Sequence, residues 1–142
     1  MSRALRRGTR AIMKPLYSHI DLRVRDRERA VAFYDPIMRC FGFELEARQP
    51  GEEWPTWRRP GDDRNGEFFG FEVDPNHKPN ENRLAFRCTS KEEVDRVTAV
   101  AVKAGAVDVD GPIVYTPRYY ASFFDDPDGN KLELCFLHEP TA

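Results

Sequence analysis

The chain has 142 residues, of which 40% are hydrophobic and ten are phenylalanine. This length allows one ordinary hydrophobic core, or two half-domains that share one, and leaves no room for a second full domain. The formal net charge of −2 is close to zero, so nothing global points to a nucleic-acid or membrane-surface partner. No apolar run approaches the roughly 20 residues that a membrane helix needs.

Residues 1–14 differ in composition from the rest. Five positive charges and no acid occur there, at Arg3, Arg6, Arg7, Arg10 and Lys14. We expect a flexible, solvated basic arm, with a polyanion-binding arm, a targeting peptide or a start at Met13 as alternatives. Residues 15–142 are expected to form a single domain. Because Cys40, Cys88 and Cys135 are isolated and lie among apolar residues, we expect reduced core cysteines and a cytoplasmic location.

The first half of the domain predicts a strand, a helix and three further strands. Residues 17–24 alternate between apolar and polar side chains, as in a half-buried strand. Asp26 is a suitable helix N-cap, and apolar residues at helical spacing follow over 29–38, with a break or kink expected near Pro36. Strands are predicted over 43–47, 54–58 and 66–73, before a polar linker over 74–82.

The second half repeats this order. A strand over 82–88 precedes a capping box at Ser90 and Glu93, and a helix then runs to Gly105. Strands are predicted near 106–109, 119–124 and 131–137. Placing His19 on Arg83 sets an offset of 83 − 19 = 64, which also places Phe69 on Glu133. The sequence therefore predicts two tandem βαβββ modules, over about 16–74 and 82–138.

The closing segment 121–136, ASFFDDPDGNKLELCF, reads as a strand, a tight turn and a second strand. On the second strand Glu133 shares a face with Lys131 and Cys135, while leucines occupy the other face. A carboxylate in the middle of a strand requires an explanation.

These features resemble the vicinal oxygen chelate superfamily, which comprises glyoxalases, bleomycin-resistance proteins and extradiol dioxygenases. The resemblance rests on the YSHIDLRV strand, the RAVAFYDPIMRCFGFE helix and the DPDGN…E hairpin. It implies an α+β fold in which two βαβββ modules form a curved, partly open mixed sheet around a cavity, with the helices outside.

The resemblance also implies a divalent metal (Zn, Ni, Mn or Fe), held by one residue from the first and one from the last strand of each module. His19 and Glu133 match two of these four positions. The other two carry Phe69, which cannot bind a metal, and Arg83, a permanent cation. His77 is the only nearby imidazole that could join the set, and its polar linker favours an exposed position.

Two main functions follow. In the first, a glyoxalase-like lyase or isomerase uses His19 and Glu133 as catalytic groups or metal ligands on a small oxygen-rich substrate. In the second, a metal-free protein of the bleomycin-resistance type sequesters a small molecule, with Arg83 binding an anionic group. Other candidate substrate-binding residues are Phe69, Trp57, Arg118 and Tyr119. A homodimer is expected because sequestration of this type uses pockets between subunits. A third alternative is an eroded site in which Arg83 and Glu133 form an ion pair.

Overall fold

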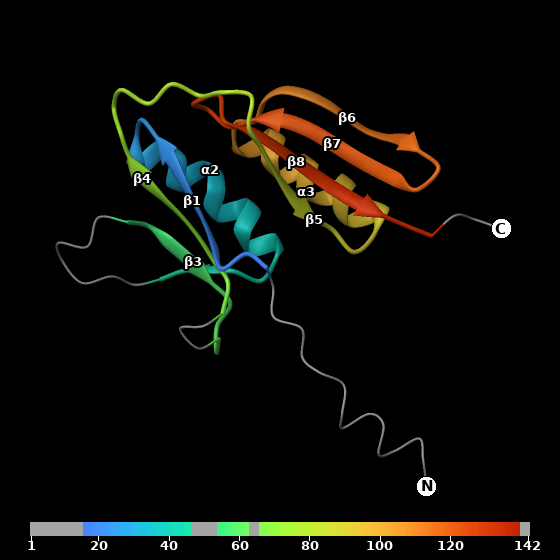
Figure 1. Cartoon of the computed structure of the whole chain (residues 1–142), viewed down its shortest axis with the longest axis horizontal. Helices are drawn as coiled ribbons and strands as arrows, with labels where there is room; N and C mark the ends of the chain where they lie inside the picture. Colours follow the sequence, from blue (N-terminus) through green and yellow to red (C-terminus); the bar gives the residue numbers. More distant parts are fainter. Residues whose placement is uncertain (1–15, 47–53, 63–65, 140–142) are drawn as a thin grey trace, which may run out of the picture.

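The structure, a computed structural model, describes residues 16–46, 54–62 and 66–139. The predicted basic arm lies outside the described residues. The elements follow the predicted order, β-α-β-β-β twice (Figure 1). They are β1 (His19–Val24), α2 (Arg27–Cys40), β2 (Glu44–Leu45), β3 (Thr56–Arg58), β4 (Phe68–Val73), β5 (Arg83–Arg87), α3 (Lys91–Ala104), β6 (Val107–Thr116), β7 (Tyr119–Asp125) and β8 (Lys131–Leu137).

The strands form two four-stranded mixed sheets of the same topology. Their orders are β1-β4-β3-β2 and β5-β8-β7-β6. In each sheet the first and last strands of the module run parallel, and the other pairings are antiparallel. The two sheets lie on opposite sides of Figure 1 and do not close into a barrel. The prediction of tandem βαβββ modules with a partly open mixed sheet is confirmed.

The helix boundaries follow from local chemistry. Asp26 caps α2 by accepting a 2.8 Å hydrogen bond from the backbone N of Arg29, and Ser90 caps α3 in the same way. Gly105 ends α3 with a left-handed φ of 116°. The predicted break at Pro36 does not occur, because α2 continues through it to Cys40, and a kink there stays a prediction. Packing of the buried face of α2 offsets the backbone hydrogen bond that proline lacks.

The register of the last strand in each module corrects the predicted alignment of the two modules. His19 pairs with Phe68, whereas Arg83 pairs with Lys131, so the offset between the last strands is 131 − 68 = 63. Glu133 lies opposite Ala85, and its equivalent in the first module is therefore Gly70 rather than Phe69. A shift of one residue moves a side chain to the other face of a strand. Phe69 accordingly points into the core.

One cluster of buried side chains serves both modules. The rings of Phe69 and Phe86 are 6.0 Å apart, and those of Phe33 and Phe124 are 6.5 Å apart. Helices α2 and α3 also contact each other. The modules therefore share one core, as the chain length suggested.

A buried polar network attaches the closing turn to the first module. Asp128 accepts a 3.1 Å hydrogen bond from the backbone N of Arg25 and pairs with the guanidinium of Arg29. Asp126 accepts a 2.6 Å hydrogen bond from the hydroxyl of Tyr34. Both carboxylates are almost fully buried. Buried charges require such partners, so the DPDGN motif has a structural role here.

All three cysteines are free, and Cys88 and Cys135 are buried. Burial raises the pKa of the Cys88 thiol to about 12, so this side chain is an inert part of the core. In the described ranges, neither helix has the length and hydropathy needed to cross a membrane.

Candidate functional site

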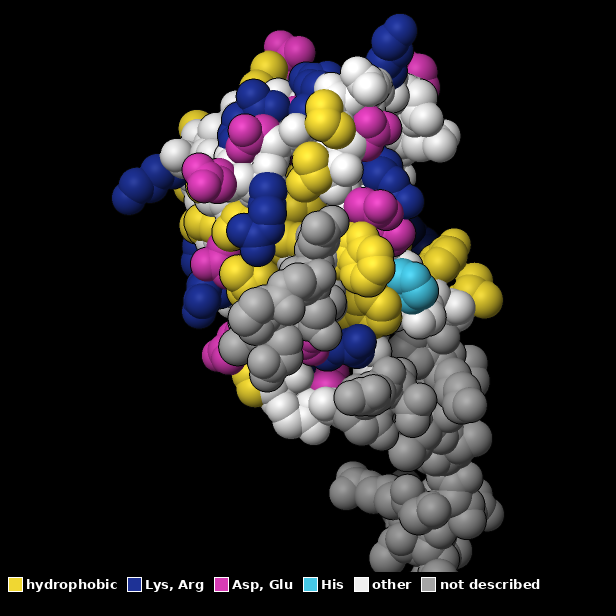
Figure 2. Space-filling model, turned by 90° about the vertical axis from the view of Figure 1, so that its left-hand side faces the viewer, with side chains coloured by type: hydrophobic (Ala, Val, Ile, Leu, Met, Phe, Trp, Pro, Cys, Tyr) yellow, Lys and Arg dark blue, Asp and Glu magenta, His cyan; other side chains and the backbone are white. Residues whose placement is uncertain are grey.

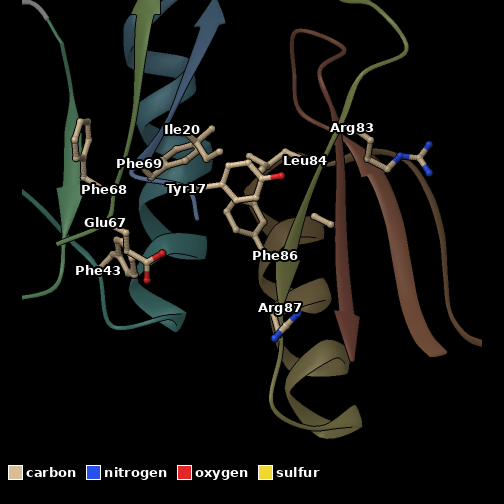
Figure 3. Close-up of a pocket in the computed structure, with 11 residues that line it drawn as sticks. Tyr17, Ile20, Phe43, Glu67, Phe68, Phe69, Arg83, Leu84, Phe86 and Arg87 are labelled. Carbon is tan, nitrogen blue, oxygen red and sulfur yellow. The ribbon is translucent and has the colours of Figure 1, made fainter. Parts of the chain in front are cut away.

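Each sheet has one face on the core and one face turned away from it. In Figure 3, Phe68 points to the side of β4 that is turned away from β5. Arg83 points to the side of β5 that is turned away from β1, while Ile20 and Leu84 lie between the two sheets. We call the side of the first sheet that carries Phe68 the first outer face. The side of the second sheet that carries Arg83 is the second outer face.

The first outer face carries a row of stacked side chains. The ring of His19 lies parallel to that of Phe68, with centroids 4.3 Å apart and an angle of 4° between the planes. The guanidinium of Arg58 lies 4.3 Å from the centroid of the same ring. Because β4 lies between β1 and β3, the ring of Phe68 lies between the side chains of His19 and Arg58. The hydroxyl of Ser18 lies 3.0 Å from Nδ1 of His19.

A hollow of about 350 Å³ opens beside this row. His19, Trp54, Arg58, Phe68 and Gly70 contribute to its lining. Gly70 lies opposite Asp21 in the middle of the sheet. A Cβ at this position would lie 2.9 Å from the backbone oxygen of Pro55, so the close approach of that backbone favours glycine. Figure 2 shows apolar side chains gathered on this side of the molecule next to a histidine.

The second outer face carries Glu133. This side chain is only 7% exposed, and its Oε2 atom has no hydrogen-bond partner. Burial raises the pKa of the Glu133 carboxyl, and the positive charge of Arg83 offsets part of this effect. A buried carboxylate oxygen without a donor is costly, so Oε2 of Glu133 requires an explanation such as a catalytic role or a bound donor.

Arg83 and two aromatic rings surround this carboxylate. The guanidinium of Arg83 crosses β8 and lies 4.5 Å from the ring centroid of Phe123, which pairs with Glu133. The rings of Tyr115 and Phe123 pack nearly perpendicular to each other, with their centroids 5.0 Å apart. Burial, followed by the charge of Asp110, raises the pKa of the Tyr115 hydroxyl. Among the described residues no ion pair joins Arg83 to Glu133, so the eroded-site alternative is not supported.

The structure does not bring His19 and Glu133 together within one chain, because they belong to outer faces turned away from each other. Gly70, the true equivalent of Glu133, has no donor atom, and Arg83 remains a cation. Within the described ranges, no group of three or more His, Cys, Asp or Glu side chains could hold a metal. The donor set of a single chain therefore does not fit the implied metal.

The other predicted residues divide between core and surface. Phe69 is 2% exposed, and Trp57 is fully buried with its Nε1 donating a 2.9 Å hydrogen bond to Asp35. Both pack in the core, and Phe69 also lines the pocket between β1 and β5. Tyr119 alternates with Phe123 and lies half-buried on the second outer face. Arg118 lies at the β6–β7 turn, five residues from Phe123, at a distance of about 16 Å along an extended strand.

The linker histidine has a structural role. His77 is half-buried, and its Nε2 lies 2.8 Å from Oδ1 of Asn130 in the closing turn. The expectation of an exposed side chain is therefore wrong, because the linker folds back onto the turn.

Sequence reasoning missed several residues of the outer faces. They are Arg58, Phe68, Tyr115 and Phe123. The signal for Phe123 was present, because it alternates with the core residue Phe124 on β7. Phe68 was missed because the repeat was aligned with one offset for all strands.

A family model agrees with this geometry. The model of the Glyoxalase/Bleomycin resistance protein/Dioxygenase superfamily matches residues 16–134. The chain belongs to this superfamily. A search of curated proteins found no match.

Solved structures of this superfamily share the fold. A glyoxalase/bleomycin resistance protein from Albidiferax ferrireducens T118 is 27% identical with a TM-score of 0.69, over 89% of this chain and 100% of that one. One from Streptomyces sp. CB03234 is 32% identical with a TM-score of 0.55, over 82% and 96%. TnmS3, an antibiotic binding protein from the same Streptomyces strain, is 29% identical with a TM-score of 0.60, over 89% and 99%.

Proposed function

We propose that the protein binds a small organic molecule with a flat body that carries hydroxyl and acidic groups, and that it does so without a metal. The observation that carries this proposal is the buried Glu133 carboxylate, whose Oε2 has no donor. A ligand hydroxyl would supply that donor. Arg83, which forms no ion pair among the described residues, would bind the acidic group, and Phe123 and Tyr115 would contact the flat body.

Membership of the superfamily is consistent with this function. TnmS3, which has the same fold, is described as an antibiotic binding protein. In this proposal the second outer face supplies the carboxylate, the guanidinium and the aromatic contacts. It also avoids the metal, for which one chain lacks a suitable donor set.

The complete site would lie between two copies of the chain. Each outer face carries part of the predicted residue set, and a homodimer that covers the second outer face with the first would bring His19 to Glu133. Exposed apolar side chains on both sheets are consistent with such a contact. They include Trp54 on the first module and Ile113, Val114 and Leu137 on the second.

The lyase or isomerase alternative, with a divalent metal at His19 and Glu133, stays a prediction and now requires two copies. A cytoplasmic location likewise stays a prediction from the reduced cysteines.

Thermal unfolding in the presence of hydroxylated aromatic acids, such as salicylate and gallate, tests the proposal. We expect at least one to raise the Tm with or without EDTA, and Arg83→Gln to abolish this rise. Arg96→Gln is the matched control, since Arg96 is exposed on α3 and its ion pair within the described part of the chain is with Glu93. A Tm rise that survives Arg83→Gln, or that EDTA removes, would contradict metal-free binding at this face.

A further inference from the structure

The side chains of the second outer face lie in rows across its strands. The row of Glu133 also contains Ala85 on β5 and Phe123 on β7, because these residues pair in the sheet. Alternate residues of a strand share a face, so the next row lies about 7 Å further along. It contains Arg87, Cys135 and Ala121. Arg87 therefore shares the face that carries Arg83 and Glu133.

Ala85 lies between the two arginines on β5 and beside Glu133 on β8. The side chains of Arg83, Ala85 and Arg87 are all exposed, as alternate residues on the outer side of an edge strand. Because Ala85 has only a methyl group, no long side chain separates the two arginines. Beside it, Oε2 of Glu133 is buried without a donor. A ligand at this oxygen therefore lies between two cationic side chains.

The two arginines differ in the charges around them. In the row of Arg83, Lys131 pairs with Asp125, with 3.7 Å between Nζ and Oδ1. In the row of Arg87, the neighbouring cysteine and alanine carry no charge. Among the described residues no ion pair joins Arg87 to a carboxylate. Arg87 therefore supplies uncompensated positive charge at its end of the face.

Both arginines act electrostatically on β8. Burial and then the charge of Glu133 raise the pKa of the Cys135 thiol, and the charge of Arg87 offsets part of this effect. Arg83 acts on the carboxyl of Glu133 in the same way. The Cα atoms of the two arginines are about 13 Å apart along the strand. One carboxylate consequently cannot pair with both guanidiniums while that of Arg83 lies over Phe123.

We propose that Arg87 is a second anion-binding residue of this face, and that the ligand is a flat diacid with its hydroxyl at Glu133 and its acidic groups at Arg83 and Arg87. The assignment rests on the metal-free binding proposed above and adds a requirement for a second acidic group. That group would receive charge-assisted hydrogen bonds from the guanidinium fork of Arg87. Arg87 would thereby distinguish diacids from monoacids.

Two ring acids that differ by one carboxylate test this role of Arg87. 5-Hydroxyisophthalate has two carboxylates and a hydroxyl, whereas 3-hydroxybenzoate has one of each. The full chain is titrated at pH 7.5 and constant ionic strength, and the methyl NMR signal of Ala85 reports binding. We expect 5-hydroxyisophthalate to bind about fivefold more tightly, as an added ion pair at an exposed guanidinium implies. Arg87→Gln should remove this preference, and Arg96→Gln should retain it.

Arg83→Gln separates this proposal from the proposed function, since it should weaken the binding of both acids. Equal wild-type affinities, or a preference that Arg87→Gln retains, would overturn the role of Arg87. Binding that depends on Arg83 would still support the proposed function. Dissociation of a wild-type dimer in Arg87→Gln, measured by sedimentation velocity, would assign the guanidinium to a carboxylate of a second copy and also overturn the proposal. If neither acid binds the wild-type chain, the proposed function fails and the role of Arg87 fails with it.

Discussion

The hydroxyl of Tyr34 donates a 2.6 Å hydrogen bond to Oδ2 of Asp126, which lies 92 residues further along the chain. Both side chains are at most 1% exposed. Burial, together with the charge of Asp126, raises the pKa of Tyr34 well above its usual value, so the proton stays on the hydroxyl. The bond joins α2 to the closing hairpin and hence the first module to the second.

Tyr34→Phe should therefore destabilise the whole domain. It leaves a buried carboxylate oxygen with one donor fewer, and we expect a loss of about 1–3 kcal/mol in the free energy of unfolding. Urea unfolding measures it. Tyr120→Phe is the control, because its hydroxyl bonds Asp95 at the exposed surface, where about 0.5 kcal/mol or less is expected. Equal losses in the two variants would show that the buried hydrogen bond contributes no more to the free energy of unfolding than the exposed one.

Asp128→Asn should also weaken the attachment of the closing turn. The carboxylate accepts from the backbone of Arg25 and pairs with Arg29, and Asn would remove its charge. We expect a loss of about 1–3 kcal/mol, since hydrogen bonds to a buried charged acceptor are weakened while the partly exposed guanidiniums of Arg25 and Arg29 stay solvated. Asp21→Asn removes a surface carboxylate that pairs with Arg23 and should cost less than about 1 kcal/mol. Thermal and urea unfolding of both variants measure these two losses of stability.

Glu133→Met should stabilise the protein while abolishing ligand binding. It removes an unpartnered buried oxygen, and we expect a gain of about 1 kcal/mol at pH 8. Because the pKa of Glu133 is raised in the folded state, the folded protein holds this proton more tightly than the unfolded chain does. The cost of Glu133 is thus fully present above the folded pKa and disappears below the unfolded pKa. The stabilising effect of Glu133→Met should therefore shrink between pH 8 and pH 4, and a gain that did not change with pH would contradict this account.

Trp57→Phe should lower stability without changing the affinity for a ligand. The indole is fully buried, and its Nε1 donates to Asp35 on α2. We expect a loss of about 1–3 kcal/mol from the unmade hydrogen bond and the smaller ring. Trp54 is 54% exposed and lies beside the hollow on the first outer face. Trp54→Phe should therefore weaken ligand binding and leave the stability unchanged. Weaker ligand binding by Trp57→Phe at unchanged stability would contradict a purely structural role for Trp57.

Mixing His19→Ala with Glu133→Ala tests the site between two copies. Neither variant alone should bind ligand with wild-type affinity. After random exchange half of the dimers are mixed, and each has one intact site, so about a quarter of wild-type capacity should return. Isothermal titration of the separate and mixed samples measures it. No recovery in a mixture shown by native mass spectrometry to contain mixed dimers would rule out a shared site.

Much of the fold could be predicted from the sequence because the signals are local. Asp26, Ser90 and Gly105 define helix ends through hydrogen bonds within a few residues. The alternation in β1 and β8 follows from the strand period, and its recurrence predicted the duplicated module. Pro36 was misjudged because its cost is offset by packing against distant elements, which no local signal records.

The sequence by itself determined the two βαβββ modules, the closing hairpin and the unusual carboxylate at Glu133. Only the tertiary structure decided which residues share a site. The face on which a side chain lies depends on the strand register, and the direction of that face depends on the orientation of the sheet. Register moved Phe69 into the core and put Gly70 in its place. The orientation of the sheets separated His19 from Glu133 and left Arg83 over Phe123. These outcomes depend on contacts between residues far apart in the chain, for which the spacing of residues along the sequence carries no direct signal.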